Sequence, residues 1–375
     1  MAHSVHTAEG SLPARAGRGA SRVFWLDAVK GIGIALIVLG HIWSIGEPSV
    51  YYEYIYSFHV PLFFFVAGLG FQSPALGFAQ HIRRKATSLI VPYLWYASLG
   101  FAFYGVGYVV AQSLGVRVPQ FDYGLWRPLV GILYGSVGDG HLVNSPVWFA
   151  LALFWVLLVG HAVNKQVASD LSRVLVMLLL AALGVWLANN HALAWSLLPA
   201  LMSLAFFQAG VVYRARVGLT SVPLAKAFAM FAFCALVWSA SPLNGMATLA
   251  EGRIGHPVLF YLFAMAGSLM VVFLCQLLDG ALPRAVRSLA WLGRYSLSIM
   301  LIHMLVIKGV KVVMIALLGT SMQEIEHDFL MGLLVLVASC LLLVPTVFVM
   351  ERYLGFTLGR FAPSIGPNRL VGERD

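Results

Sequence analysis

FWLDAVKGIGIALIVLGHIW, residues 24–43, is the stretch that decides the fold of this chain. Its apolar run approaches the length of about 20 helical residues that crosses a bilayer core. Three ionisable side chains interrupt it, namely Asp27, Lys30 and His41. Such groups are costly inside a membrane, and they usually face a protein interior or a water-filled cavity. The stretch therefore predicts a transmembrane helix with one functional face.

Similar apolar runs fill most of the remaining sequence. The 375 residues are 60% hydrophobic and only 10% charged, whereas soluble domains carry about 25% charged residues. We therefore predict an all-α, polytopic integral membrane protein with about ten transmembrane helices. The first apolar run contains Ile32–Ile45, and the others lie near 55–72, 87–114, 146–164, 173–189, 192–213, 223–241, 257–279, 295–318 and 328–351.

The remaining segments leave no room for a separate soluble domain. We expect a disordered cytoplasmic N-terminus at 1–22, a transmembrane domain at 23–352 and a cytoplasmic tail at 353–375. No small-residue cleavage site follows the first apolar run, which predicts a retained helix and not a signal peptide.

The basic residues indicate the orientation. With the N-terminus in the cytoplasm, 18 of the 24 Lys and Arg residues fall in cytoplasmic segments and three, Arg117, Arg127 and Arg253, on the other side. This asymmetry follows the positive-inside rule. We expect an inner-membrane protein surrounded by lipid, with both termini cytoplasmic. Because topology accounts for the net charge of +9, we expect no nucleic-acid partner.

The cysteines carry no chemistry of their own in this interpretation. Cys234, Cys275 and Cys340 all fall within apolar runs, where a free thiol behaves as a small hydrophobic group. We therefore expect neither a disulfide framework nor a metal site.

The ionisable residues of the first helix share one face. At about 100° per residue, Lys30 and His41 point within about 20° of each other, with Asp27 about 60° away. Lys30 and His41 are separated by about 16 Å along the axis, so they form the two ends of a polar track. The alternative interpretation is that Lys30 reaches back to the cytoplasm beside Asp27 while His41 caps the helix.

The second helix places another histidine at the same depth. His59 lies at its outer start, and Pro61 is tolerated in a first helical turn. A short loop joins the two helices, so we expect antiparallel neighbours with His41 and His59 close together. Two histidines facing a cavity suit general-base chemistry on a hydroxyl.

A basic cluster begins the third helix. Arg83, Arg84 and Lys85 are either a topology signal or a clamp for the phosphates of a cytosolic acyl donor. Pro92 predicts a kink just beyond them. Farther along, Leu125–Tyr134 is apolar but too short to span, which predicts a re-entrant or interfacial segment.

These motifs together resemble the acyltransferase 3 family of bacterial membrane O-acyltransferases, across most of the chain. The chain departs from the family pattern at two positions. Lys30 stands where the family usually has Arg, although the fucose 4-O-acetylase-like branch also has Lys there. Ala67 stands where the family has Ser. The matching positions are Leu26-Asp27, Lys30 and His41; Phe58-His59-Val60-Pro61-Leu62-Phe63-Phe64-Phe65 with Gly68; Arg84, Lys85, Leu89, Pro92 and Tyr93; Pro146-Val147-Trp148-Phe149; and Ser296-Leu297 with His303.

The resemblance implies transfer of an acetyl group from cytosolic acetyl-CoA to a hydroxyl of a cell-surface or exported polysaccharide or its lipid-linked precursor. His41 would be the catalytic residue, as general base or transient acyl carrier, and His59 would either support the acceptor side or orient His41. Lys30, Arg84 and Lys85 would hold the donor.

Weaker candidates complete the predicted site. Asp27 is either part of the catalytic face or a structural partner of a basic neighbour. Phe64 and His303 are assigned to the donor channel, where a core histidine is the alternative. For the acceptor we name Glu53, Asp139, His141 and Trp148, against solvated loops and an interfacial aromatic belt. Lys308 and Lys311 have no partner apparent from sequence.

Two other functions fit the same sequence. One is a transporter or flippase, which would be favoured by buried charges spread over several helices and by paired broken helices. The other is an acyltransferase that uses a different donor such as succinyl-CoA. The sequence indicates neither the acceptor sugar nor the oligomeric state.

Overall fold

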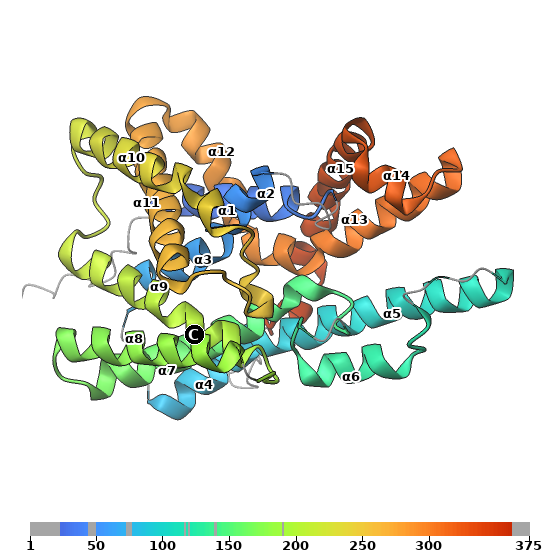
Figure 1. The fold of residues 1–375 in the computed structure, drawn as a ribbon, viewed down its shortest axis with the longest axis horizontal. Coiled ribbons are helices and arrows are strands. Elements are labelled where there is room, and N and C mark those ends of the chain that lie inside the picture. The colour runs from blue at the N-terminus through green and yellow to red at the C-terminus, as the bar shows by residue number, and fades with distance from the viewer. Residues whose placement is uncertain are drawn as a thin grey trace, which may run out of the picture.

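The computed structural model describes residues 23–43, 50–72, 77–115, 118, 121–138, 141–189 and 191–361, and within these ranges the chain forms helices and no strands. Figure 1 shows their arrangement. The α-helices are α1 (Phe24–Leu39), α2 (Val50–Tyr56), α3 (His59–Leu69), α4 (Phe78–Lys85), α5 (Val91–Leu114), α6 (Trp126–Tyr134), α7 (Trp148–Gln166), α8 (Asp170–Ala188), α9 (Leu197–Arg216), α10 (Leu224–Ser239), α11 (Pro257–Ala281), α12 (Pro283–Arg294), α13 (Ser296–Leu318), α14 (Met322–His327) and α15 (Phe329–Tyr353).

The predicted fold class is confirmed. Eight helical runs in the described chain are long and apolar enough to cross a membrane, beginning with the continuous run Phe78–Leu114 that joins α4 to α5. Helices α1 and α3 have 16 and 11 residues, short of the about 20 that a lone span needs. Counting them gives the approximate total of ten.

Helix α1 lies inside the bundle. It packs against α3, α11, α12 and α13, and in Figure 1 the blue α1 and α3 lie among the yellow to orange helices of the second half of the chain. Its crossing with α12 depends on two glycines. A Cβ on Gly31 would lie 2.1 Å from the Leu289 carbonyl oxygen, and one on Gly293 only 1.8 Å from that of Asp27. Small residues let membrane helices approach this closely.

A second glycine contact fixes α3 against α9. A Cβ on Gly68 would meet the Phe207 carbonyl oxygen at 2.0 Å, and one on Gly210 would meet that of Phe65 at 2.1 Å. The two helices that carry the predicted motifs, α1 and α3, are therefore each held by a backbone-to-backbone crossing.

The basic cluster ends at an irregular turn. Residues Ala86–Ile90 form a π-helical turn between α4 and α5, immediately before the predicted kink at Pro92. Proline has no N–H to donate, so the helical ladder is interrupted there. The freed Thr87 carbonyl packs against Gly359, whose φ of 70° suits glycine.

The structure explains the two lysines that had no partner in the sequence. The Lys308 ammonium donates to the Val143 carbonyl oxygen at 2.9 Å, which ties the segment before α7 to α13. Lys311 forms an ion pair of 2.8 Å with Glu326 of α14. The predicted non-spanning segment Leu125–Tyr134 contains the nine-residue helix α6.

Candidate active site

His41 lies just past the C-terminal end of α1. The last carbonyls of a helix have no partner within it, and the Ile37 carbonyl oxygen lies 2.7 Å from His41 Nδ1. Because a carbonyl can only accept, Nδ1 carries the proton in the neutral ring. The Nε2 atom therefore keeps its lone pair, which is the state that a general base needs.

His59 repeats this arrangement at the start of α3. Its Nδ1 donates to the Ile55 carbonyl oxygen at 2.7 Å, which leaves Nε2 as the acceptor. Tyr56 joins the two histidines, since its ring contacts His59 edge-on at 4.8 Å between centroids and its hydroxyl donates to the Gly40 carbonyl oxygen at 2.9 Å. Gly40 is the residue before His41, so Tyr56 holds the turn that carries it.

His303 of α13 packs directly on His41. The ring centroids are 5.1 Å apart at an angle of 74°, an edge-to-face contact. His303 Nδ1 lies 3.0 Å from the carbonyl oxygens of both Ile299 and Met300. Its Nε2 atom is fully buried and has no hydrogen-bond partner. The imidazole of His303 therefore packs against that of His41 and helps to hold it in place.

His41 and His59 line one cavity of about 700 Å³, which we name the histidine cavity. It thus brings together the two histidines that the sequence predicted to be neighbours, and Trp148 with them. Its other lining residues come from α1, α2, α3, α7 and the turn before it, α13 and the loop between α10 and α11: they include Ile37, Tyr56, Phe63, Pro146, Phe149, Thr248, Glu251, Arg253, Met300 and Met304.

A second cavity of about 670 Å³, which we name the basic cavity, lies at the Lys30 end of the polar track on α1. Lys30, Arg84 and Lys85, which the sequence analysis assigned to the donor, all line it. Lys30 also forms an ion pair with Asp27 at 2.9 Å, one turn earlier on α1. Asp27 therefore positions the lysine and lines neither cavity.

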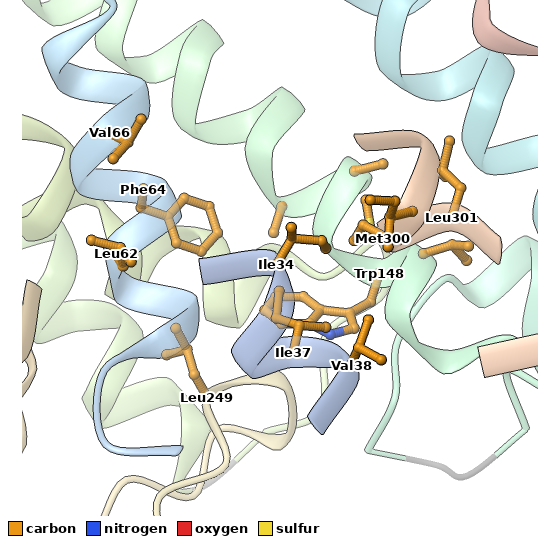
Figure 2. Packing of buried hydrophobic residues seen from close by; sticks show 14 of the residues in the cluster. Ile34, Ile37, Val38, Leu62, Phe64, Val66, Trp148, Leu249, Met300 and Leu301 are labelled. Carbon is orange, nitrogen blue, oxygen red and sulfur yellow. The ribbon is translucent and has the colours of Figure 1, made fainter. Parts of the chain in front are cut away.

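The two cavities adjoin at a set of apolar side chains. Four residues line both: Ile37 of α1, Phe63 of α3, Phe149 of α7 and Met300 of α13. Figure 2 labels Ile37, Met300 and Trp148 among the buried apolar side chains of this region. We name this set the constriction. It separates the three basic side chains from the two histidines.

Several predicted site residues line neither cavity. Phe64 is fully buried and packs on Phe149 at 5.0 Å between centroids. Glu53 lies on α2, and His141 contacts Tyr123 edge-on at 5.4 Å. Asp139 lies outside the described residues. These four positions remain predictions from the motif or the loop alone.

Two groups of cavity residues were missed from the sequence. Glu251 and Arg253 form an ion pair in the histidine cavity, on a loop that the Thr248–Arg253 bridge closes. His81 lines the basic cavity, where it is buried and stacks on His161 at 4.3 Å. Its position three and four residues before Arg84 and Lys85 places it on their helical face, a signal that the sequence does contain.

The described residues contain no group of three or more His, Cys, Asp and Glu side chains that could hold a metal ion. The arrangement places two imidazoles that could accept a proton in one cavity and three basic side chains in the adjoining one.

Comparison with known proteins identifies the family of the chain. Residues 23–352 match the family model of the acyltransferase domain of the acyltransferase 3 family. No curated protein and no solved structure matches the chain significantly. The match covers every helix from α1 nearly to the end of α15, and the chain therefore belongs to the acyltransferase 3 family of membrane acyltransferases.

Proposed function

We propose that this protein transfers an acetyl group from cytosolic acetyl-CoA to a hydroxyl of an exported or cell-surface polysaccharide, or of its lipid-linked precursor. The observation that carries the proposal is the pair of cavities that meet at the constriction, one basic and one lined by histidines. Such a division suits a donor and an acceptor that approach the same bond from opposite sides of a membrane.

The donor binds in the basic cavity. Lys30, Arg84 and Lys85 supply charge-assisted hydrogen bonds to its phosphates. The wall between them and the constriction is apolar, with Leu26, Leu89 and Leu297 among its residues, and it accommodates the pantetheine arm. This end of the fold is the side that the positive-inside rule assigns to the cytoplasm.

The acceptor binds in the histidine cavity, where His41 acts as the general base. His41 Nε2 takes the proton of the acceptor hydroxyl while its oxygen attacks the thioester carbonyl carbon. The tetrahedral intermediate then collapses, the carbon–sulfur bond breaks, and the CoA sulfur takes the proton from His41. The products are the O-acetyl ester and free CoA. In the variant with an acyl-histidine intermediate, the same Nε2 attacks the thioester first.

Replacement of His41 tests the assignment. Purified protein with radiolabelled acetyl-CoA and a polysaccharide acceptor should transfer label, and His41→Ala should lower the rate by about 10²–10⁴-fold, the usual contribution of a general base. His327→Ala is the matched control, because that imidazole is exposed on α14. Normal transfer by His41→Ala would remove His41 from the mechanism.

The same assay separates the other functions. A wild type that translocates a glycolipid and neither transfers nor hydrolyses acetyl-CoA is a flippase. A wild type that uses succinyl-CoA in preference to acetyl-CoA keeps the mechanism and changes the donor.

A further inference from the structure

The constriction is the place where the two cavities adjoin, because its four residues line both of them. Ile37 and Met300 are 7% and 5% exposed, and all four members of the ring are apolar. It offers no hydrogen bond, so it does not recognise a polar group. What it can discriminate is the width of whatever passes through it.

The members of the ring are held in place by their neighbours. Phe63 and Phe149 contact each other edge-to-face at 5.8 Å between centroids. Gly33 of α1 leaves room for Phe63, since a Cβ there would lie 2.8 Å from its ring. Met300 is the most adaptable member, because methionine has three rotatable bonds and no branch.

The position of the ring relative to His41 determines what must cross it. Ile37 precedes His41 by four residues, about 6 Å along the helix, and His41 lines only the histidine cavity. A thioester that enters from the basic cavity therefore reaches His41 only after its acyl group has passed between Ile37, Phe63, Phe149 and Met300.

We propose that these four residues form an acyl filter, which admits a short unbranched acyl group and excludes branched or bulky ones. The inference rests on the proposed function, in which the donor enters from the basic cavity. In this proposal the selectivity for the acyl donor depends on side chains that contact the acyl group while it moves from the basic cavity to His41.

A change of acyl preference tests the filter. In the full-length protein in detergent, Met300→Ala should raise the kcat/KM ratio of isobutyryl-CoA to acetyl-CoA by at least about tenfold, the usual discrimination of a pocket against a single carbon. Ile37→Val, a smaller change, should raise the ratio in the same direction. Hydrolysis of acetyl-CoA without acceptor should also rise, because water from the histidine cavity gains access to the thioester.

Leu301→Ala is the matched control. Leu301 is the next residue on α13, is fully buried, and lines neither cavity, so its loss creates a void without widening the ring. Thermal unfolding and acetyl-CoA binding establish that each variant is folded. If Met300→Ala does not fold, the kcat/KM ratio measured for Ile37→Val alone tests the filter.

The outcomes separate the filter from the function on which it rests. A wild type that neither transfers nor hydrolyses any acyl-CoA overturns both. An active wild type overturns the filter alone if the folded Met300→Ala and Ile37→Val leave the ratio unchanged, or if Leu301→Ala raises it equally. A rise confined to the two ring variants supports the filter.

Discussion

At the scale of the residue, the histidine at position 41 depends on backbone carbonyls more than on other side chains. Its Nδ1 uses the Ile37 carbonyl that the end of α1 leaves free. In the common catalytic triad a carboxylate orients the imidazole. Here a backbone carbonyl at the end of α1 orients it. The turn that carries His41 therefore needs its own support, and Tyr56 supplies it.

Removing the Tyr56 hydroxyl should weaken that support. Tyr56→Phe loses the hydrogen bond to the Gly40 carbonyl oxygen, which costs about 1 kcal/mol, or about fivefold in kcat. The KM for acetyl-CoA should stay unchanged, because the proposed donor site is the other cavity. Steady-state kinetics of both substrates measures the difference.

Tyr54→Phe is the control for that substitution. Tyr54 also lies on α2, and its hydroxyl donates to the Ser239 carbonyl oxygen at 3.0 Å, away from both cavities. An equal loss of kcat in both variants would mean that α2 as a whole, and not the contact to Gly40, sets the rate.

At the scale of the element, glycine contacts determine where α1 lies. The α1–α12 crossing brings the backbones together at Gly31 and Gly293, and the segment Asp27–Gly31 at this crossing carries Lys30. The ion pair of Lys30 with Asp27 is local to α1, whereas the place of Lys30 in the basic cavity depends on where the crossing with α12 holds the helix.

A methyl group at this crossing should disturb both stability and donor binding. Gly293→Ala places a Cβ 1.8 Å from the Asp27 carbonyl oxygen, an overpacking that typically costs about 1–3 kcal/mol. We expect a lower melting temperature in detergent and a higher KM for acetyl-CoA.

Gly309→Ala provides the comparison, because no heavy atom lies within 4 Å of its added methyl group. Alanine is the better helix former by about 1 kcal/mol, so this variant should be neutral or slightly more stable. If Gly293→Ala behaves in the same way, the crossing tolerates more space than the structure shows.

At the scale of the whole molecule, the arrangement of two cavities is useful only if they face opposite sides of the membrane. The charge asymmetry of the sequence assigns the basic cavity to the cytoplasm. Loop residues at the two ends of the bundle allow this assignment to be measured directly.

Cysteine labelling tests the orientation. Leu243, which is 80% exposed between α10 and α11, should react as Leu243→Cys with an impermeant maleimide added to intact cells. Lys165→Cys, exposed at the end of α7, should react only after the membrane is opened. Labelling of the unsubstituted protein measures the background from the native cysteines, which lie within α10, α11 and α15. The reverse pattern would invert the topology and place the basic cavity outside.

The sequence by itself determined the features that depend on local periodicity. Hydropathy set the all-α membrane fold, and helical spacing placed Lys30 and His41 at the two ends of one face. Spacing also grouped Arg84 with Lys85, and would have added His81. Each of these follows from residues within a few turns of one another, whose relation a single helix fixes.

Only the tertiary structure decided which residues complete the site. The constriction takes one residue from each of four helices, the contact of His41 with His303 joins α1 to α13, and the Glu251–Arg253 pair comes from a distant loop. The tertiary structure also buries Phe64 in the core, whereas its neighbour Phe63 lines both cavities. The physical reason is that helix crossings, here fixed by glycine contacts, depend on close packing between segments that share no sequence period.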